Sequence, residues 1–459
     1  MHKVTIIGAG LAGTEAAFQL AELAKKYQIK LKIKLYEMRP QVQTPAHHTD
    51  KFAELVCSNS LGSEFITTAR GLLIQEMKLL NSLIINSAIK SKVPAGQALA
   101  VDRDLFAELI SKKILENPAI EVIREEFTEI STNSEQFLII ASGPLTSANL
   151  AREIQKLTSG KDFLNFFDAA SPIIAQESIN MDIAFKASRY GKGETDDYIN
   201  CPFYSAEEYY KFHEALVNAE RAPLKDFEKE NMRYFEGCMP VEAIAERGKD
   251  TLRFGPLKPV GLRDPRHPDK RPFAVVQLRQ DNVLGSLYNI VGFQTNLKWG
   301  EQKRIFSMIP GLENLEILRY GVMHQNIFLN SPVLLNKDLS LKEYPNIYFA
   351  GQITGVEGYT ESAATGIAVA HALIKKILEQ SEAHAVFPKL TMLGALINYV
   401  TSADPKTFQP INSNWALVNP NPEEIDKKIL KDKKLKNEFL AGRALDLIKG
   451  SASTSLIRT

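Results

Sequence analysis

Residues 4–13 read VTIIGAGLAG, and this stretch decides the fold. A short apolar run, rich in β-branched residues, leads directly into glycines spaced G-x-G-x-x-G. Such a turn joins a first parallel strand to a first helix: Gly8 permits the tight turn, Gly10 lets the backbone approach a pyrophosphate, and Gly13 lets the helix pack closely on the strand. Because the free N–H groups at the start of that helix attract anions, we expect a diphosphate to bind here.

The context of the glycine turn favours a dinucleotide site. Residues 14–24 have apolar positions at helical spacing, and residues 31–36 (LKIKLY) predict a second strand that ends at Glu37. An acid about 20 residues beyond the last glycine accepts a hydrogen bond from a ribose hydroxyl in such sites. The alternative is a glycine-rich turn with a solvated glutamate. The residues expected to bind the dinucleotide are Gly8, Ala9, Gly10, Leu11, Ala12, Gly13 and Glu37.

The composition is that of an ordinary globular protein. The 459 residues are 44% hydrophobic and 24% charged, with a net charge of +1. This length allows two or three domains, and the near-neutral charge gives no overall preference for nucleic acid or membrane, so any such partner must bind a local patch. Three cysteines, Cys57, Cys201 and Cys238, are too few and too widely spaced for a disulfide framework or a metal site. We expect reduced thiols and no metal.

The chain shows no targeting or membrane segment. A buried strand is predicted from residue 4 onward, which leaves no room for a signal peptide, and no apolar run approaches the length needed to cross a bilayer. We therefore expect a soluble, cytoplasmic protein with no membrane partner.

Two later segments are predicted to return to the nucleotide. Residues 136–141 form an apolar run that ends in Ser-Gly-Pro, which is typical of the strand that precedes a flavoprotein's second domain. Residues 346–350 (NIYFA) predict another buried strand, and the glycine-rich residues 351–359 follow it. A helix beginning near residues 361–366 suits a flavin contact, in which the helix amino end faces the electron-rich edge of the ring.

The fold class expected from these elements is α/β. A Rossmann-like cofactor domain is interrupted by a smaller α/β insertion domain that carries the substrate. The predicted bounds are 1–97 for the first part of the cofactor domain, 98–330 for the insertion, with a possible partial return near 206–245, 331–400 for the last part of the cofactor domain, and 401–459 for a helical extension.

One stretch of the predicted insertion is strongly basic. Residues 246–279 contain nine Lys or Arg against four acids, and prolines keep the stretch from being helical. Such a cluster suits RNA phosphates. A solvated loop would have the same composition, and the two interpretations stand evenly.

Several strings together resemble the TrmFO family of folate- and FAD-dependent uracil-5 methyltransferases, which are GidA-related. They include GAGLAGTEAAFQLA, ELVCSNS, YFEGCMPVE, VVQLRQDN and FAGQITGVEGYTESAATG, and the likeness runs from residue 3 to about residue 380. The resemblance implies FAD, methylenetetrahydrofolate and NAD(P)H as cofactors and RNA as substrate, with the T-loop uridine of tRNA favoured and 23S ribosomal RNA possible. The sequence departs from the family pattern at Gly62 and Gln325, where an arginine is typical.

Carried over to this sequence, the family pattern assigns site residues. Cys57 and Cys238 correspond to the functional thiols, and Cys201 is expected to be structural. The flavin-flanking residues are Gly351, Gln352, Thr354, Gly355 and Tyr359, with Tyr359 against the ring.

Methylation of uracil at carbon 5 needs a nucleophile and a base, and two thiols can supply them. Carbon 5 of uracil becomes nucleophilic when a thiolate adds at carbon 6, and a base must later remove the carbon-5 proton. We take Cys238 as candidate nucleophile, with Arg247 and Lys249 as nearby cations in the sequence, and Cys57 as candidate proton acceptor or flavin-side thiol. The two roles are open to exchange.

Three histidines are candidates for stacking on the pterin or the base. They are His47, His48 and His324. A loop or core histidine with a satisfied hydrogen bond is the competing interpretation for each.

Two other functions compete with methyl transfer. A GidA-type wobble-uridine enzyme shares the glycine-rich start but carries a long helical carboxyl-terminal domain, whereas about 60 residues follow residue 400 here. A flavin-binding RNA chaperone without turnover is the second, and the presence of both Cys57 and Cys238 disfavours it. The oligomeric state and the choice of NADH or NADPH stay open.

Overall fold

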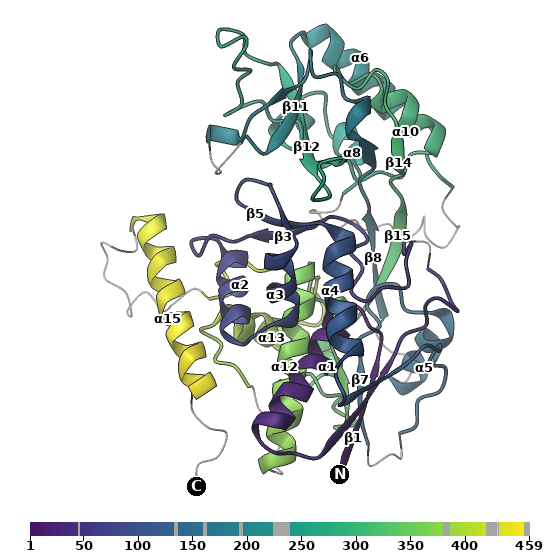
Figure 1. Cartoon of the computed structure of the whole chain (residues 1–459), viewed down its shortest axis with the longest axis vertical. Coiled ribbons are helices and arrows are strands. Elements are labelled where there is room, and N and C mark those ends of the chain that lie inside the picture. The colour runs from purple at the N-terminus through teal and green to yellow at the C-terminus, as the bar shows by residue number, and fades with distance from the viewer. Residues whose placement is uncertain are drawn as a thin grey trace.

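The computed structural model describes residues 1–44, 46–132, 136–158, 163–191, 196–223, 239–379, 386–418, 429 and 431–453, with all their side chains except those of 163–168, 324, 325 and 451–453. Figure 1 shows two lobes joined by the long strands β8 (Phe163–Ala169) and β15 (Met323–Leu329), which pair antiparallel. We call them the cofactor lobe and the insertion lobe. In the described part of the chain, no helix has the length and apolar character needed to span a bilayer.

The cofactor lobe is built on a five-stranded parallel sheet. Its strand order is β16-β7-β1-β2-β6, so the first strand of the chain lies in the middle. Strands from both ends of the sequence pair here, as the analysis of residues 346–350 predicted. The strands are β1 (His2–Ile7), β2 (Leu31–Tyr36), β6 (Ile120–Ile123), β7 (Phe137–Ile140) and β16 (Ile347–Phe349).

Helices α1 (Leu11–Lys26) and α12 (Tyr359–Glu379) pack directly on each other beside this sheet (Figure 1). Gly366 makes the close approach possible, because a Cβ there would lie 2.3 Å from the carbonyl oxygen of Ala12. The remaining helices of the lobe are α2 (Ala69–Leu79), α3 (Leu83–Lys90), α4 (Arg103–Leu115), α5 (Ala148–Leu157), α11 (Ser331–Leu334), α13 (Met392–Ser402) and α15 (Lys433–Ser453). A small antiparallel sheet joins β3 (Ser60–Ser63), β5 (Ala98–Val101) and β4 (Lys92–Val93).

Two fully buried carboxylates hold helix starts in this lobe. Glu15 accepts hydrogen bonds from the backbone N–H groups of Leu83 and Ile84 at the start of α3. Glu76 accepts from the N–H groups of Met392 and Leu393 at the start of α13, at 2.7 and 2.8 Å. These bonds satisfy N–H groups that have no partner within their own helices, and they tie the helices to the core.

The insertion lobe has its own antiparallel sheet and its own hydrophobic core. The strand order is β10-β11-β12-β13-β9-β14, and helices cover the sheet (Figure 1). The strands are β9 (Ile173–Ala175), β10 (Phe185–Lys186), β11 (Tyr198–Phe203), β12 (Ala274–Gln280), β13 (Leu287–Ile290) and β14 (Ile317–Arg319). The helices are α6 (Ala206–Val217), α8 (Val241–Glu246), α9 (Thr251–Phe254) and α10 (Trp299–Phe306), and short 3₁₀ turns lie at Gln176–Ser178, Arg189–Gly191 and, in the cofactor lobe, Gln352–Thr354.

The sheet pairing differs from the predicted domain bounds at one place. The prediction placed 98–330 in the insertion, yet β6 and β7 hydrogen-bond to β2 and β1 in the cofactor sheet. Parallel strands need a crossover of a dozen or more residues, and α4 supplies it before β6. The prediction of a buried strand within residues 136–141 is confirmed, since β7 pairs with β1, and its return to a nucleotide stays a prediction.

Candidate functional site

The glycine turn between β1 and α1 has the geometry that its spacing predicts. Gly8 has φ +96°, and a Cβ there would lie 2.6 Å from the carbonyl oxygen of Ala141. Gly13 packs so closely that a Cβ would lie 1.8 Å from the carbonyl oxygen of Gly8. At Gly10 no atom lies within 4 Å of an added Cβ. Gly8 and Gly13 therefore shape the turn, whereas Gly10 leaves open space beside the start of α1.

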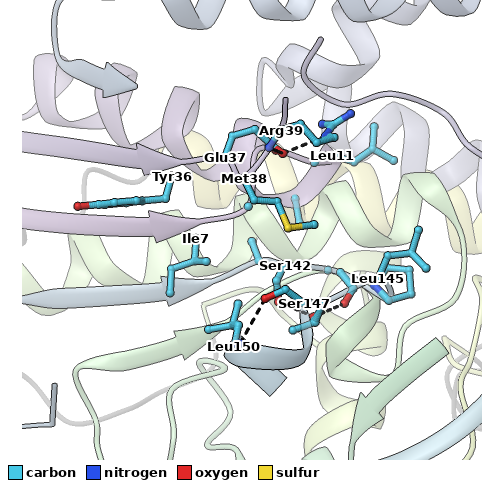
Figure 2. A pocket seen from close by; sticks show the side chains of 18 of the residues that line it. Ile7, Leu11, Tyr36, Glu37, Met38, Arg39, Ser142, Leu145, Ser147 and Leu150 are labelled. Carbon is cyan, nitrogen blue, oxygen red and sulfur yellow. Dashed lines mark hydrogen bonds and ion pairs between the residues drawn. The ribbon is translucent and has the colours of Figure 1, made fainter. Parts of the chain in front are cut away.

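That open space is part of a cavity at the carboxyl ends of the parallel strands. The cavity measures about 1020 Å³ including its mouth, at the upper end of the usual range for ligand sites. Figure 2 shows Glu37 and Arg39 on one side, Ser142 and Leu145 on the other, and Met38 between them. Ligands of open parallel sheets bind at this edge.

Most of the residues predicted to bind the cofactor line this cavity. They are Gly8, Gly10, Leu11, Ala12, Glu37, Gly351, Gln352 and Tyr359. Ala9, Gly13, Thr354 and Gly355 lie outside its lining. The sequence analysis missed Arg39, Glu54 and the acids Glu125 and Glu126, which line it. The turn at residues 142–147 also lines it, and it begins with the Ser-Gly-Pro that follows the strand predicted to return to the nucleotide.

Glu37 lies at the end of β2, where the ribose-binding acid was expected, and is 5% exposed. It accepts hydrogen bonds from Ala9 N at 3.1 Å and from Arg39 Nε at 2.9 Å. Burial acts to raise the pKa of Glu37, but the bonds and charge of Arg39 and the Ala9 N–H outweigh burial and lower it. Glu37 is therefore an ionised acceptor, and a carboxylate with two oxygens retains lone pairs for a further donor.

The second glycine turn brings α12 to the same cavity. Gly351 has φ +87°, and its N–H donates to Thr365 Oγ1 at 2.6 Å. Thr354 donates to the Gly351 carbonyl oxygen at 2.8 Å, and a Cβ at Gly355 would meet the Phe408 ring at 2.5 Å. Thr354 and Gly355 thus hold the turn that presents Gly351 and Gln352 to the cavity.

Cys57 lies beside the Tyr359 end of the cavity. The Tyr359 hydroxyl accepts hydrogen bonds from Cys57 N at 2.7 Å and Ser58 N at 3.1 Å, and Val56 lines the cavity. The Cys57 thiol donates to the Ala169 carbonyl oxygen at 3.5 Å. Burial raises the pKa of Tyr359 well above its usual value, so the side chain is a neutral phenol. The hydroxyl of the predicted flavin residue therefore binds the backbone of the residue that carries one predicted thiol.

The other two cysteines differ in what can be said of them. Cys201 is fully buried in the insertion core, and burial raises the pKa of its thiol, as expected of a structural cysteine. Cys238 lies outside the described residues, so the structure gives no distance between Cys238 and Cys57.

Arginines from both lobes surround the Cys57 segment, residues 55–59. Arg103 of α4 donates to the Leu55 carbonyl oxygen at 2.5 Å and pairs with Asp281, with Nε 3.0 Å from Oδ2. Arg279 of β12 donates to Ser58 Oγ at 2.7 Å and to Asn59 Oδ1 at 2.9 Å. The segment is thereby fastened to the insertion lobe as well as to the cofactor lobe.

A second cavity, of about 1520 Å³ including its mouth, lies between the lobes. It adjoins the first, since Glu54 lines both. Arg103 and Asp281 line it, with Trp299 stacked on Tyr320 at 5.1 Å between ring centroids and 17° between planes. A space with aromatic and cationic walls beside the first cavity suits a heteroaromatic substrate.

The predicted histidines are divided between these cavities. His47 lines the first cavity, and burial, followed by the charge of Arg39, lowers its pKa to about 4, so its ring is neutral at pH 7. His48 lines the second cavity. The side chain of His324 lies outside the described ones. Over the described residues no group of histidine, cysteine and acidic side chains is arranged to hold a metal.

The basic stretch 246–279 is only partly available to phosphates. Arg279 is buried at the lobe interface. Arg266 pairs with Asp264 and donates to the backbone carbonyl oxygens of residues 181–184. These two arginines therefore have structural partners. Arg263, Lys270 and Arg271 are exposed.

Gly62, where the resembled family has arginine, has φ +103°. A Cβ there would lie 1.9 Å from Cδ of Arg70, whose Nε donates to Glu361 at 3.0 Å. The Arg70 side chain thus occupies the space that a side chain at position 62 would need. The side chain of Gln325, the other departure, lies outside the described ones.

Comparison with known proteins gives consistent results. The family model described as glucose inhibited division protein A matches residues 3–381. The protein named methylenetetrahydrofolate–tRNA-(uracil-5-)-methyltransferase TrmFO from Brevibacillus brevis is 54% identical over 97% of both chains. The protein of that name from Halalkalibacterium halodurans is 55% identical over 97% of this chain and 98% of its own. The structure of Aquifex aeolicus GidA superposes with a TM-score of 0.68 at 15% identity, covering 99% of this chain and 74% of GidA, and shows the shared fold.

Proposed function

The chain belongs to the TrmFO family of GidA-related proteins, and on this premise we propose that it methylates carbon 5 of a uridine in tRNA, with FAD and methylenetetrahydrofolate as cofactors. One observation carries the proposal: Cys57 contacts Tyr359 beside the cavity that the glycine turn opens. A thiol beside a dinucleotide cavity fits a reaction that needs both a thiol and a dinucleotide cofactor. NAD(P)H as the reductant of the flavin is part of the proposal.

The residues that line the first cavity fit FAD. The empty space at Gly10 and the amino end of α1 suit the pyrophosphate, and the ionised Glu37 suits a ribose hydroxyl. Gly351, Gln352 and Tyr359 would hold the ring, while Ala9, Gly13, Thr354 and Gly355 support these contacts from behind. When bound, FAD supplies the hydride that completes the methyl group.

The thiols act on the uracil ring. Addition of a thiolate at carbon 6 forms a sulfur–carbon bond and moves an electron pair to carbon 5, which attacks the one-carbon donor. Loss of the carbon-5 proton to a base then expels the amine carrier from the transferred carbon and leaves an exocyclic methylene on the ring. Hydride addition to that methylene gives the methyl group and expels the thiolate from carbon 6. We assign the attacking thiolate to Cys238, on sequence grounds, and proton removal to Cys57.

The domain division that fits the sheet pairing is also a proposal. We assign residues 1–157 and 331–400 to the FAD domain, the residues of the second sheet to the insertion, and residues 401–459 to an extension that includes α15. The cytoplasm, where tRNA is modified, is the compartment we propose.

Covalent trapping tests this function. A tRNA that carries 5-fluorouridine at the target position cannot lose its carbon-5 substituent as a proton, so the enzyme–RNA adduct should accumulate and survive denaturing electrophoresis. Cys238→Ala should form no adduct yet keep its flavin, and Cys57→Ala should trap RNA without methylating it. The reverse pattern exchanges the two roles, and the absence of any adduct with wild-type protein contradicts covalent activation of uracil.

Mapping of 5-methyluridine distinguishes the RNA targets. Mass spectrometry of tRNA and 23S ribosomal RNA from cells lacking the protein should show loss of 5-methyluridine from tRNA alone. Loss from ribosomal RNA instead would keep the chemistry and change the substrate. Unchanged 5-methyluridine in both RNAs would favour the non-catalytic or wobble-uridine alternatives.

A further inference from the structure

We propose that Arg279, on β12 of the insertion lobe, is a positioning residue that holds the Cys57 thiol in place for the reaction. The inference rests on the role of Cys57 in the proposed function. It assigns to the insertion lobe a direct part in setting the geometry of a thiol that the cofactor lobe carries.

The guanidinium of Arg279 binds two consecutive residues directly after Cys57. Its Nη2 donates to Ser58 Oγ at 2.7 Å and its Nε donates to Asn59 Oδ1 at 2.9 Å. Arg279 is 8% exposed and Asn59 is fully buried, so water competes little for these bonds. A planar fork that meets two acceptors fixes orientation as well as distance, which a single ammonium group does not.

Arg279 is one of several groups that hold the segment. Tyr359 binds the backbone N–H groups of Cys57 and Ser58, and Arg103 binds the Leu55 carbonyl oxygen. The Asn59 amide also donates to the carbonyl oxygens of Val101 and Gln280, at 3.0 and 2.9 Å. Loss of the Arg279 fork therefore leaves Asn59 anchored through Nδ2, but it releases Ser58 Oγ from its guanidinium donor, next to the thiol, and loosens the thiol against the Ala169 carbonyl oxygen.

The charge of Arg279 gives a second argument. Asp281, the acid that directly follows β12, makes two hydrogen bonds to Arg103. The acceptors Ser58 and Asn59 are neutral, and burial lowers the pKa of Arg279. A buried cation held by neutral partners carries a desolvation cost that a smaller neutral residue would avoid. A neutral residue would fill this space at a lower desolvation cost. We therefore infer that the function of the Arg279 guanidinium is to orient the Cys57 segment.

Substitution of Arg279 tests the proposal through kinetics. Arg279→Lys keeps the charge and loses the fork, and Arg279→Gln loses both. Both variants should bind FAD normally and show kcat lowered about 10-fold or more, with the KM for tRNA and folate within about 2-fold of wild type. Arg189→Lys is the matched control, because Arg189 donates to Gln277 on the same strand at 2.9 Å but contacts nothing in residues 55–59. It should stay within about 2-fold in kcat.

Two further measurements keep the inference separate from the methyltransferase assignment. Ser58→Ala should lower kcat partially, and the Ser58→Ala/Arg279→Lys double variant should be no slower than Arg279→Lys, because the two changes break the same contact.

Alkylation of Cys57 by iodoacetamide, followed by peptide mass spectrometry, needs no substrate. The alkylation rate should be at least about 3-fold higher in Arg279→Lys than in Arg189→Lys, because the loosened thiol leaves the Ala169 carbonyl oxygen. An unchanged alkylation rate, a rise in KM alone, or full rescue of kcat by lysine would overturn the positioning role. Inactive wild-type protein would overturn the proposed function while the alkylation result still stands.

Discussion

The glycine turn and the Cys57 segment border the same cavity but are encoded in different ways. At the turn, the contact of Gly13 with the Gly8 carbonyl oxygen lies within the unit β1-α1-β2, and Gly8 also packs against Ala141, just after the neighbouring strand β7. The Cys57 segment depends on partners that lie 302, 112 and 221 positions away, at Tyr359, Ala169 and Arg279. A site made from one supersecondary unit is visible in a short sequence pattern, whereas a site made where two lobes meet is not.

Gly10→Val should have the largest effect. The valine side chain would enter the empty space beside the start of α1, where the pyrophosphate is expected, while the turn itself keeps its contacts because nothing lies within 4 Å of the added Cβ. We expect loss of flavin absorbance in the purified protein with the far-ultraviolet circular dichroism retained.

Gly442→Val is the control for this change. Gly442 lies in α15, and an added Cβ there also has nothing within 4 Å. That variant should keep its flavin. A fully loaded, yellow Gly10→Val protein would refute the pyrophosphate site at the turn.

The sequence was sufficient for the first βαβ unit of the cofactor lobe because the signals of that unit are local. The spacing of Gly8, Gly10 and Gly13 and the position of Glu37 predict one βαβ unit, and the unit is present. The apolar residues between 72 and 89 keep helical spacing, yet two helices lie there: they meet at Asn81, which has φ +56°, and Ser82 caps the second. Propensity changes little across such a break, so periodicity alone did not find it.

The sequence was insufficient for the Cys57 segment, because the residues that contact this segment do not recur at any spacing that a sequence pattern would reveal. Arg279 counted as one of nine basic residues in a stretch interpreted either as an RNA-phosphate site or as a solvated loop, yet it is buried against Asn59. Arg103 carried no signal at all as the first residue of a helix. Whether an arginine faces solvent or closes an interface depends on the pairing of two lobes, which composition does not contain.

Tyr359→Phe should have the next largest effect, and it tests the thiol segment from the side opposite Arg279. Phenylalanine keeps the ring but removes the oxygen that accepts from Cys57 N and Ser58 N. The two N–H groups are partly buried, and the loss of their shared acceptor loosens the segment, so we expect kcat to fall about 10-fold or more with flavin content unchanged. Steady-state kinetics and the visible spectrum measure both.

Tyr348→Phe is the matched control for the hydroxyl. The Tyr348 hydroxyl is buried and has no hydrogen-bond partner in the described part of the chain. Removal of that oxygen should leave kcat unchanged. Equal losses in the two variants would mean that the Tyr359 hydroxyl acts through general packing rather than through the Cys57 segment.

A smaller effect is expected on RNA binding from the exposed part of the basic stretch. The triple change Arg263→Gln, Lys270→Gln and Arg271→Gln removes exposed cations and leaves Arg266 and Arg279 in their structural contacts. If each cation contacts a phosphate, the slope of log affinity against log salt should fall by about 2–3, and flavin reduction by NAD(P)H should not change. Changing Lys25, Lys30 and Lys90, which are exposed on the cofactor lobe, to glutamine is the charge-matched control. Equal salt slopes in the two triple variants would assign residues 246–279 to the solvated surface.

The smallest effect is expected on stability, and it concerns neither site but the carboxylate that joins α2 to α13. Burial raises the pKa of Glu76 from 4.5 to about 8, an effect that its hydrogen bonds to Leu393 N and Met392 N only partly offset. Because the folded protein then binds this proton more tightly than the unfolded chain does, Glu76 contributes stability that is complete below about pH 4.5 and is lost as the pH rises toward 8. The free energy of unfolding should therefore fall across this range with a slope contribution of at most about 1.4 kcal/mol per pH unit.

Glu76→Gln should flatten the curve of unfolding free energy against pH, whereas Glu22→Gln, on the exposed face of α1, should leave the shape of that curve unchanged. Urea unfolding at several pH values measures the slope. If wild type and Glu76→Gln gave parallel curves, the carboxylate would have to be ionised throughout, held by the two N–H groups at the start of α13, and burial would not be the dominant influence on it.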